Sequence, residues 1–166
     1  MNSKRIQLTL FVPESLSAPI EEIRSRYNPV QHNLIAAHET LCREDELTSL
    51  EAVLKNLEQL DFPAFTIPFT TPIRFDSGKG LLLPALDDSM FQGLRKLVLK
   101  GIVNQPRTHA PHLTLMHPRN STCTDPLFKE IQTINLPDRF HFNQISLIEQ
   151  VNGGAWVIKK EWLLSS

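Results

Sequence analysis

Alternating or continuous apolar residues mark predicted strands along the chain, and apolar residues at three- and four-residue spacing mark predicted helices. Residues 6–12 alternate and then become apolar before Pro13, which predicts a strand that enters a core. A helix is expected from Ser15 or Ser17 to about Tyr27, where Asn28-Pro29 should break it. The other expected elements are a strand at 33–41, a helix at 43–60, short proline-broken strands within 62–73, a strand at 81–83, a helix from 87 or 88 to 98, a strand at the second motif described below, a short helix near 125–131, and a final hairpin of 142–148 and 155–158 that turns at 152–154.

The loose alternation of helices and strands favours a layered α/β arrangement with mostly antiparallel pairing. A chain of 166 residues has a natural size for one compact domain, or for two small lobes that share a core. Neither a low-complexity tract nor a linker interrupts the pattern. We therefore expect residues 1–166 to form a single domain with two pseudo-symmetric lobes.

Composition excludes several classes of function. The hydrophobic fraction of 41% and the charged fraction of 21% are ordinary for a globular protein. A net charge of −1 provides no global positive field, so we do not expect long duplex DNA as a partner. No run approaches the ~20 apolar residues of a membrane span.

The targeting and redox features indicate a cytoplasmic protein. Lys4 and Arg5 precede an apolar run as in a secretory signal, but that run is short and polar residues interrupt it, so we reject a signal peptide. Cys42 and Cys123 are too few and too far apart for a disulfide scaffold or a zinc knuckle. Both are expected to be reduced thiols.

The sequence His-x-Thr-Leu occurs twice, at 38–41 and at 112–115, each time inside a predicted strand. Side chains at i and i+2 of a strand point to the same face, so each copy offers an imidazole beside a hydroxyl. If the two strands face each other across a groove, the four side chains converge on a space the size of a phosphate. One imidazole could then accept a proton while the other donates one.

This doubled motif resembles the signature of the 2H phosphoesterase superfamily, particularly its bacterial RNA 2′,3′-cyclic phosphodiesterase (2′-5′ RNA ligase-like) branch. Pro111 before the second histidine and the closing pattern of 145–148 followed by 156–162 are also similar to that family. The resemblance implies an α+β, bilobal fold in which two small, mainly antiparallel sheets flank a central cleft and helices pack outside. It also implies metal-independent chemistry on phosphoesters, without a cofactor.

Carried over residue by residue, the resemblance makes His38 and His112 the acid/base pair, and it makes Thr40 and Thr114 donors to the phosphoryl oxygens. The expected substrates are RNA ends or nucleotides that carry a 2′,3′-cyclic phosphate or a 2′-5′ linkage, and the expected oligomeric state is a monomer. Opening a cyclic phosphate needs a base to activate water and an acid to protonate the departing sugar oxygen. The sequence leaves open which histidine is the base, and whether the reaction runs as hydrolysis or as ligation.

Three positions in or near the motifs bear on the substrate: one departs from the family pattern, and two lie at the same offset after each histidine. Glu39 stands between the first His and Thr, where the family usually has an apolar residue, and alternation places it on the face away from the cleft. His117 lies five positions after His112, where several relatives have a basic side chain, and Arg43 occupies the matching offset after His38. Arg43 and His117 are therefore candidate substrate-binding residues.

Other interpretations stay open beside the phosphoesterase. One is a non-catalytic RNA- or nucleotide-binding module on the same fold. Another is a thiol-dependent hydrolase, since strand alternation would place Cys42 on the same face as His38 and Thr40. The histidines at 109, 112 and 117 match no standard zinc spacing, so no metal is expected. Arg107, His109 and Arg119 are candidates for an anion-binding rim.

Overall fold

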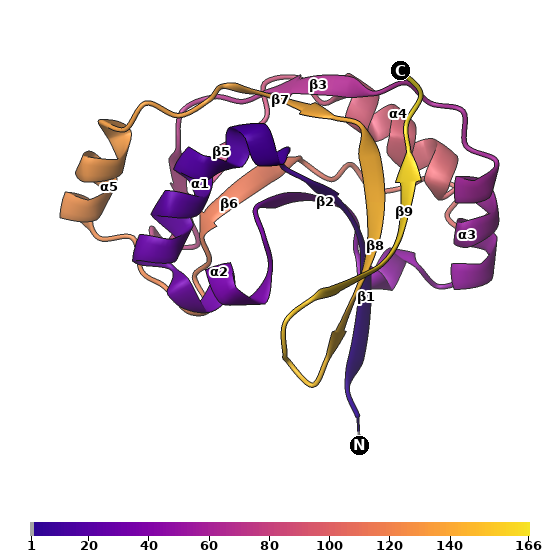
Figure 1. Ribbon diagram of the computed structural model, residues 1–166, viewed down its shortest axis with the longest axis horizontal. Helices are drawn as coiled ribbons and strands as arrows, with labels where there is room; N and C mark the ends of the chain where they lie inside the picture. The colour runs from indigo at the N-terminus through magenta and orange to yellow at the C-terminus, as the bar shows by residue number, and fades with distance from the viewer. Residues whose placement is uncertain (1) are drawn as a thin grey trace.

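The computed structural model describes residues 2–166. Its largest sheet has four antiparallel strands in the order β2-β1-β8-β9. These strands are β1 (Lys4–Phe11), β2 (His38–Cys42), β8 (Gln144–Val151) and β9 (Val157–Leu163). The hairpin of β8 and β9 turns at Asn152 and Gly153, which both have positive φ, as the Asn-Gly-Gly pattern predicts. This hairpin and the first half of β1 extend beyond the body of the molecule (Figure 1).

A second sheet of three antiparallel strands has the order β4-β5-β6, and β3 pairs with β7 in a separate two-stranded sheet. The strands are β3 (Phe65–Pro68), β4 (Ile73–Phe75), β5 (Gly80–Pro84), β6 (His112–Met116) and β7 (Arg139–Phe142). The prolines within 62–73 lie at the end of β3 and between strands, as expected for residues that cannot donate a ladder hydrogen bond. The prediction of small, mainly antiparallel sheets is confirmed, with one more two-stranded sheet than expected.

Helices lie on both flanks of these sheets. They are α1 (Glu14–Tyr27), α2 (Pro29–Leu34), α3 (Leu50–Glu58), α4 (Ser89–Val98) and α5 (Asp125–Gln132), with a 3₁₀ turn η1 (Glu44–Glu46) after β2. In Figure 1, α1, α2 and α5 lie on the side of β5 and β6, and α3 and α4 lie on the opposite side. Helix α1 contacts β6, and α4 contacts β2, so each half of the chain sends a helix to the motif strand of the other half.

Two predicted elements are wrong. The segment 33–41 is not one strand, because Pro29 occupies the first turn of a new helix, α2, where its missing N–H costs nothing. The strand starts only at His38. The segment 43–60 is not one helix, because the Glu46 carboxylate accepts from the Arg43 backbone N–H at 3.0 Å and closes the turn η1 before α3 begins at Leu50.

A single cluster of buried side chains connects the sheets and helices. Alternate residues of β1 and β6 supply its centre, including Leu8, Leu10, Leu113 and Leu115 at 0 to 1% exposure. The motif strands β2 and β6 are each the edge strand of a different sheet, and they lie against one another.

Within residues 2–166, no helix combines the length and apolar character needed to cross a membrane.

Candidate active site

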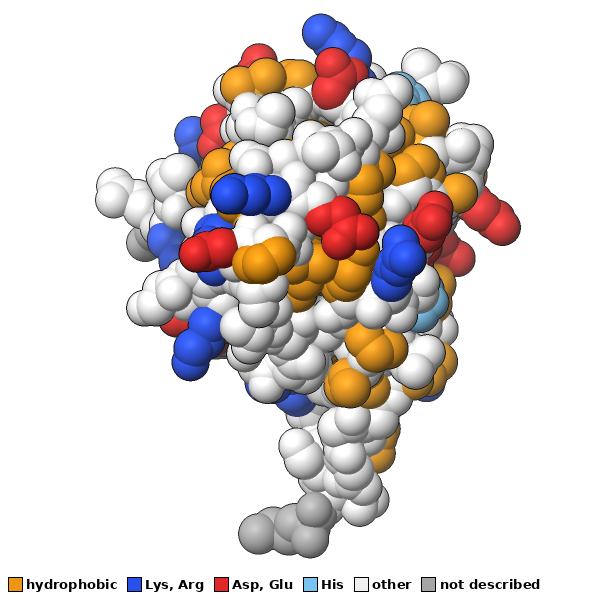
Figure 2. Space-filling view, turned by 90° about the vertical axis from the view of Figure 1, so that its left-hand side faces the viewer, with side chains coloured by type: hydrophobic (Ala, Val, Ile, Leu, Met, Phe, Trp, Pro, Cys, Tyr) orange, Lys and Arg blue, Asp and Glu red, His pale blue; other side chains and the backbone are white. Residues whose placement is uncertain are grey.

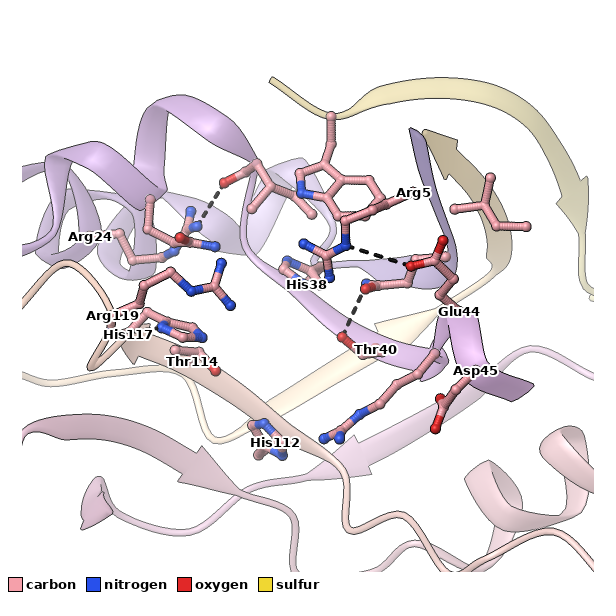
Figure 3. A pocket seen from close by; sticks show the side chains of 16 residues that line it. Arg5, Arg24, His38, Thr40, Glu44, Asp45, His112, Thr114, His117 and Arg119 are labelled. Atoms are coloured by element: carbon pink, nitrogen blue, oxygen red, sulfur yellow. Dashed lines mark hydrogen bonds and ion pairs between the residues drawn. The ribbon is translucent and has the colours of Figure 1, made fainter. Parts of the chain in front are cut away.

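Both His-x-Thr motifs open onto one cavity of about 550 Å³ between the two motif strands. All six residues that the sequence singles out line it: His38, Thr40, Arg43, His112, Thr114 and His117. Figure 3 shows His38 and Thr40 on one strand facing His112 and Thr114 on the other. Along each motif strand the histidine and threonine are half-buried, and the intervening residue is buried, as the two-residue period of a strand requires.

Both motif strands shift register by one residue directly after the threonine. Leu41 is the extra residue in β2, because Thr9 pairs with Thr40 and Leu8 pairs with Cys42. Leu115 is the extra residue in β6, because Leu82 pairs with Thr114 and Leu81 with Met116. Such bulges redirect the side chains that follow and are frequent near active sites.

The two bulges explain which residues face the cavity. Strict alternation would place Cys42 beside Thr40, but the extra residue turns Cys42 and Met116 into the core at 0 and 1% exposure. The same shift brings the next residues, Arg43 and His117, to the cavity side. Burial raises the pKa of the Cys42 thiol to about 12, so the thiol does not supply a nucleophilic thiolate at neutral pH.

The two imidazoles are held in the same way. Nδ1 of His38 lies 2.9 Å from the carbonyl oxygen of Ala36, and Nδ1 of His112 lies 2.9 Å from that of Ala110. A carbonyl only accepts, so each Nδ1 carries the hydrogen and donates it. In both rings Nε2 is therefore the nitrogen that is free to take or give a proton.

Burial lowers the pKa of both histidines. The pKa of His38 falls to about 4, chiefly because burial disfavours the imidazolium, and the nearby Arg24 and His112 act in the same direction. The pKa of His112 is also lowered by burial, and Arg43 contributes to this. Both rings are therefore mainly neutral at pH 7.

Thr40 has a hydrogen-bond partner that sequence reasoning missed. Nε2 of Gln7 donates to Oγ1 of Thr40 at 3.1 Å, which leaves the threonine O–H available to donate into the cavity. Gln7 belongs to β1, the neighbour of β2, where Arg5 and Gln7 are polar residues at alternate positions that line the cavity. This alternation of polar residues along β1 was the available signal.

The cavity lining holds more positive than negative side chains: Arg5, Arg24, Arg43 and Arg119 against Glu44 and Asp45. Arg24 is 2% exposed and is already bound to Glu21 and to the Ile35 carbonyl, whereas Arg5 faces Glu44 at 3.7 Å. Among residues 2–166, Arg43 and Arg119 form no ion pair. They are the guanidinium groups best placed to meet an anionic ligand.

The β8–β9 hairpin adds an aromatic side chain to the cavity wall. The backbone N–H of Trp156 donates to the Leu34 carbonyl at 2.8 Å, which ties the hairpin to α2. The Arg5 guanidinium lies 5.3 Å from the centre of the Trp156 ring, a cation–π distance. Trp156 thereby lines the cavity from a segment more than 100 residues away from the first motif.

Two of the three residues expected at an anion-binding rim do not line the cavity. Arg107 pairs with Asp45, and His109 is buried with Nε2 3.1 Å from the Thr40 carbonyl. Only Arg119 of that group lines the cavity. In the part of the chain that the structure describes, no cluster of three or more His, Cys, Asp or Glu side chains could hold a metal ion.

An α+β fold with two edge strands that present matching His-x-Thr motifs to one cationic cavity defines a class of proteins. Residues 12–154 match the family model described as the 2'-5' RNA ligase superfamily, and the chain belongs to this superfamily of 2H phosphoesterases. No curated protein matches the chain in sequence.

Solved structures confirm the fold. Escherichia coli LigT in apo form is 16% identical with a TM-score of 0.68, and the alignment covers 100% of this chain and 99% of that one. The LigT complex with NADP⁺ gives 15% identity, a TM-score of 0.68 and 98% coverage of both chains. A crystal structure described as a phosphoesterase gives 14% identity and a TM-score of 0.62, covering 99% of this chain and 100% of that chain. At these identities the likeness shows the fold alone.

Proposed function

We propose that the protein is a metal-independent phosphodiesterase that hydrolyses 2′,3′-cyclic phosphates at RNA ends or on nucleotides. The observation that carries this proposal is the pair of imidazoles that face one cavity, each with Nδ1 bound to a backbone carbonyl and Nε2 free. This arrangement supports one proton transfer on each side of a phosphate. Membership of a superfamily of phosphoesterases supports the same class of reaction.

The reaction needs two proton transfers, and the two histidines provide them. One Nε2 takes a proton from water as the water oxygen attacks phosphorus. The bond from phosphorus to one ribose oxygen breaks, and the other Nε2–H protonates that oxygen. One water is consumed, and the product carries a 2′- or 3′-phosphate. The hydroxyls of Thr40 and Thr114 donate to the phosphoryl oxygens, which gain charge in the transition state.

We assign the base role to His38 and the acid role to His112. A group with a pKa of about 4 is unprotonated at neutral pH and can accept a proton, which suits His38. The acid must be charged before it reacts. A bound phosphate anion beside His112 favours the imidazolium form and raises the pKa of that ring in the complex.

The cavity suits a short, anionic ligand. Its volume of about 550 Å³ lies within the range of small-molecule and cofactor sites. Arg43 and His117 come directly after the two bulges and would contact phosphate oxygens or a flanking phosphate. We propose short RNA ends or cyclic nucleotides as substrates, a monomeric protein, and a cytoplasmic location.

Turnover of defined cyclic phosphates tests the proposal. The substrates are the four nucleoside 2′,3′-cyclic monophosphates and a short RNA with a 2′,3′-cyclic phosphate end, with EDTA present throughout. We expect the wild type to hydrolyse at least one of them, and we expect His38→Ala and His112→Ala each to lose about 10²- to 10⁴-fold in kcat. Circular dichroism should show an unchanged fold, because both rings are only half-buried.

His141→Ala is the matched control, since His141 is an exposed histidine on β7 that does not line the cavity. Its turnover should equal that of the wild type. Full turnover in the His112→Ala variant would contradict the two-histidine mechanism. Tight binding of the RNA without turnover, retained in both alanine variants, would instead indicate the non-catalytic binding module.

A further inference from the structure

The carboxyl group of Glu39 links the two motifs to each other. Glu39 is the middle residue of the first motif, it is 0% exposed, and its Oε1 accepts the backbone N–H of His112 at 2.7 Å. We propose that Glu39 is a positioning residue that holds the second motif strand against the first, so that the imidazoles of His38 and His112 keep their relative placement. This role rests on the proposed function, because it matters only if both rings act on one phosphate.

This contact lies where it can set the spacing between the two motif strands. His112 is the first residue of β6, and β6 pairs with β5 along only one of its edges. The other edge faces β2, which belongs to a different sheet, so no strand ladder sets the spacing between the two motifs. The side chain of Glu39 crosses that gap and binds the same residue whose ring faces the cavity.

Two further contacts connect β2 and β6 or their flanking residues across this gap, which we call the seam. Neither of them binds His38 or His112. At the far end of β6, Oδ1 of the buried Asn28 accepts the backbone N–H of His117 at 2.8 Å. On the β2 side, the His109 ring lies 3.1 Å from the Thr40 carbonyl. The motif strand β6 is thus held at both ends by buried side-chain acceptors from the first part of the chain. Of these two acceptors, Glu39 is the one that binds the backbone of His112.

The surroundings of Glu39 suit a neutral carboxyl group. Burial raises the pKa of Glu39 well above its usual value, and the hydrogen bond from the His112 N–H acts in the opposite direction. Its second oxygen, Oε2, has no hydrogen-bond partner among residues 2–166. A glutamine would keep an acceptor oxygen at Oε1 and the same size. A leucine, the residue at the equivalent position 113 of the second motif, would remove the acceptor.

The experiment compares Glu39→Gln and Glu39→Leu with the wild type. The control is Val53→Ala, which removes buried volume on α3 away from the cavity and lowers stability without touching the seam. Steady-state kinetics on a 2′,3′-cyclic nucleotide should show kcat of Glu39→Leu reduced about 10- to 100-fold with KM within about threefold, because a small displacement of a reacting group has that effect on rate. Glu39→Gln and Val53→Ala should keep kcat within about threefold of the wild type.

Rescue by glutamine separates positioning from general stability. A loss of kcat in Val53→Ala as large as that in Glu39→Leu, at similar loss of stability, would overturn the proposal. Equal losses in Glu39→Gln and Glu39→Leu would also overturn it, because the acceptor oxygen would then not be the feature that matters. Wild-type kcat in Glu39→Leu would overturn it directly.

A second readout needs no substrate and keeps this inference distinct from the proposed function. NMR measures hydrogen exchange of the His112 backbone amide and the pH titration of the His112 and His38 imidazoles. In Glu39→Leu we expect faster amide exchange at His112 and a His112 titration displaced toward its usual pKa, with His38 little changed. Glu39→Gln should match the wild type in both. If the wild type turns over no cyclic phosphate, the proposed function fails, while an unchanged His112 in Glu39→Leu is what would refute the role of Glu39.

Discussion

The Thr40 hydroxyl accepts a hydrogen bond from Gln7, and this makes it a directed donor. Gln7 donates to Oγ1 at 3.1 Å from the adjacent strand, so the threonine proton is left for a ligand oxygen. The sequence predicted the threonine, because residues i and i+2 of a strand share a face. It did not predict Gln7 or Trp156, because their contacts join segments that are distant along the chain.

Replacing Thr40 by valine keeps the shape of the side chain and removes the donor. We expect kcat for a cyclic phosphate to fall about 10²-fold, since that is the usual effect of losing one donor to a developing oxyanion. Thr40→Ser keeps the hydroxyl and should recover most of the rate. Steady-state kinetics of the two variants measure this, and equal rates in Thr40→Val and the wild type would remove Thr40 from the mechanism.

At the scale of elements, the structure depends on irregularities that a periodic pattern does not reveal. The strand parity of the sequence placed Cys42 beside Thr40, whereas the bulge at Leu41 turns Cys42 into the core. The expected helix at 43–60 is wrong because the Glu46 carboxylate turns inward, where it accepts hydrogen bonds from the Arg43 backbone N–H and from the Arg95 side chain. Long apolar periodicities such as that of α4 were predicted correctly, because nothing interrupts them.

Arg95 on α4 joins three elements at the base of the site. It is 0% exposed, it donates to the Leu41 carbonyl at 2.5 Å in the bulge of β2, and it pairs with Glu46 of η1 at 2.5 Å. Burial alone would raise the pKa of Glu46, but the hydrogen bonds from Arg95 and the Arg43 backbone hold it below its usual value. The pair is therefore charged at neutral pH.

We expect Arg95→Met to lower the free energy of unfolding by about 3–5 kcal/mol, because it leaves a buried carboxylate without its partner. The double variant Arg95→Met with Glu46→Leu should recover a large part of that loss, since neither charge remains. Urea unfolding of the three proteins provides the comparison. A single variant as stable as the wild type would show that the ion pair does not hold α4 against β2.

At the scale of the molecule, an excess of positive over negative side chains is found at the cavity. The chain has a net charge of −1, and on the face shown in Figure 2 the basic and acidic side chains are interspersed. The cavity nevertheless gathers four arginines around two histidines that burial keeps mainly neutral. A local field of this kind attracts a small anion without holding a long polyanion.

The same electrostatics predict the pH dependence of turnover. His38 as base must be unprotonated, so kcat/KM should fall as the pH drops through about 4. His112 as acid must be protonated, and its pKa lies below the usual 6.5, so kcat/KM should fall again as the pH rises through that lower value. We expect a bell-shaped profile of kcat/KM with its maximum below pH 6.5.

The profile of kcat should lie at higher pH than that of kcat/KM, because a bound phosphate anion favours the imidazolium in the complex. Initial rates across pH 3.5 to about 9 on one cyclic nucleotide measure both profiles. A value of kcat/KM that rises steadily into the alkaline range would be incompatible with these roles. The His141→Ala control should reproduce the wild-type profile.

The matching bulges in β2 and β6 have a consequence for the polarity of the substrate. The strand period places a threonine two residues after each histidine on the cavity side, and the bulges bring Arg43 and His117, each five residues after a histidine, to the same side. Two such equivalent halves do not by themselves distinguish the 2′ side of a ribose from its 3′ side. If the protein opens a 2′,3′-cyclic phosphate as proposed, we expect the choice between the two phosphate isomers to depend on positions where the halves differ, such as Arg43 against His117 and Gln7, which binds Thr40 alone of the two threonines in the described residues.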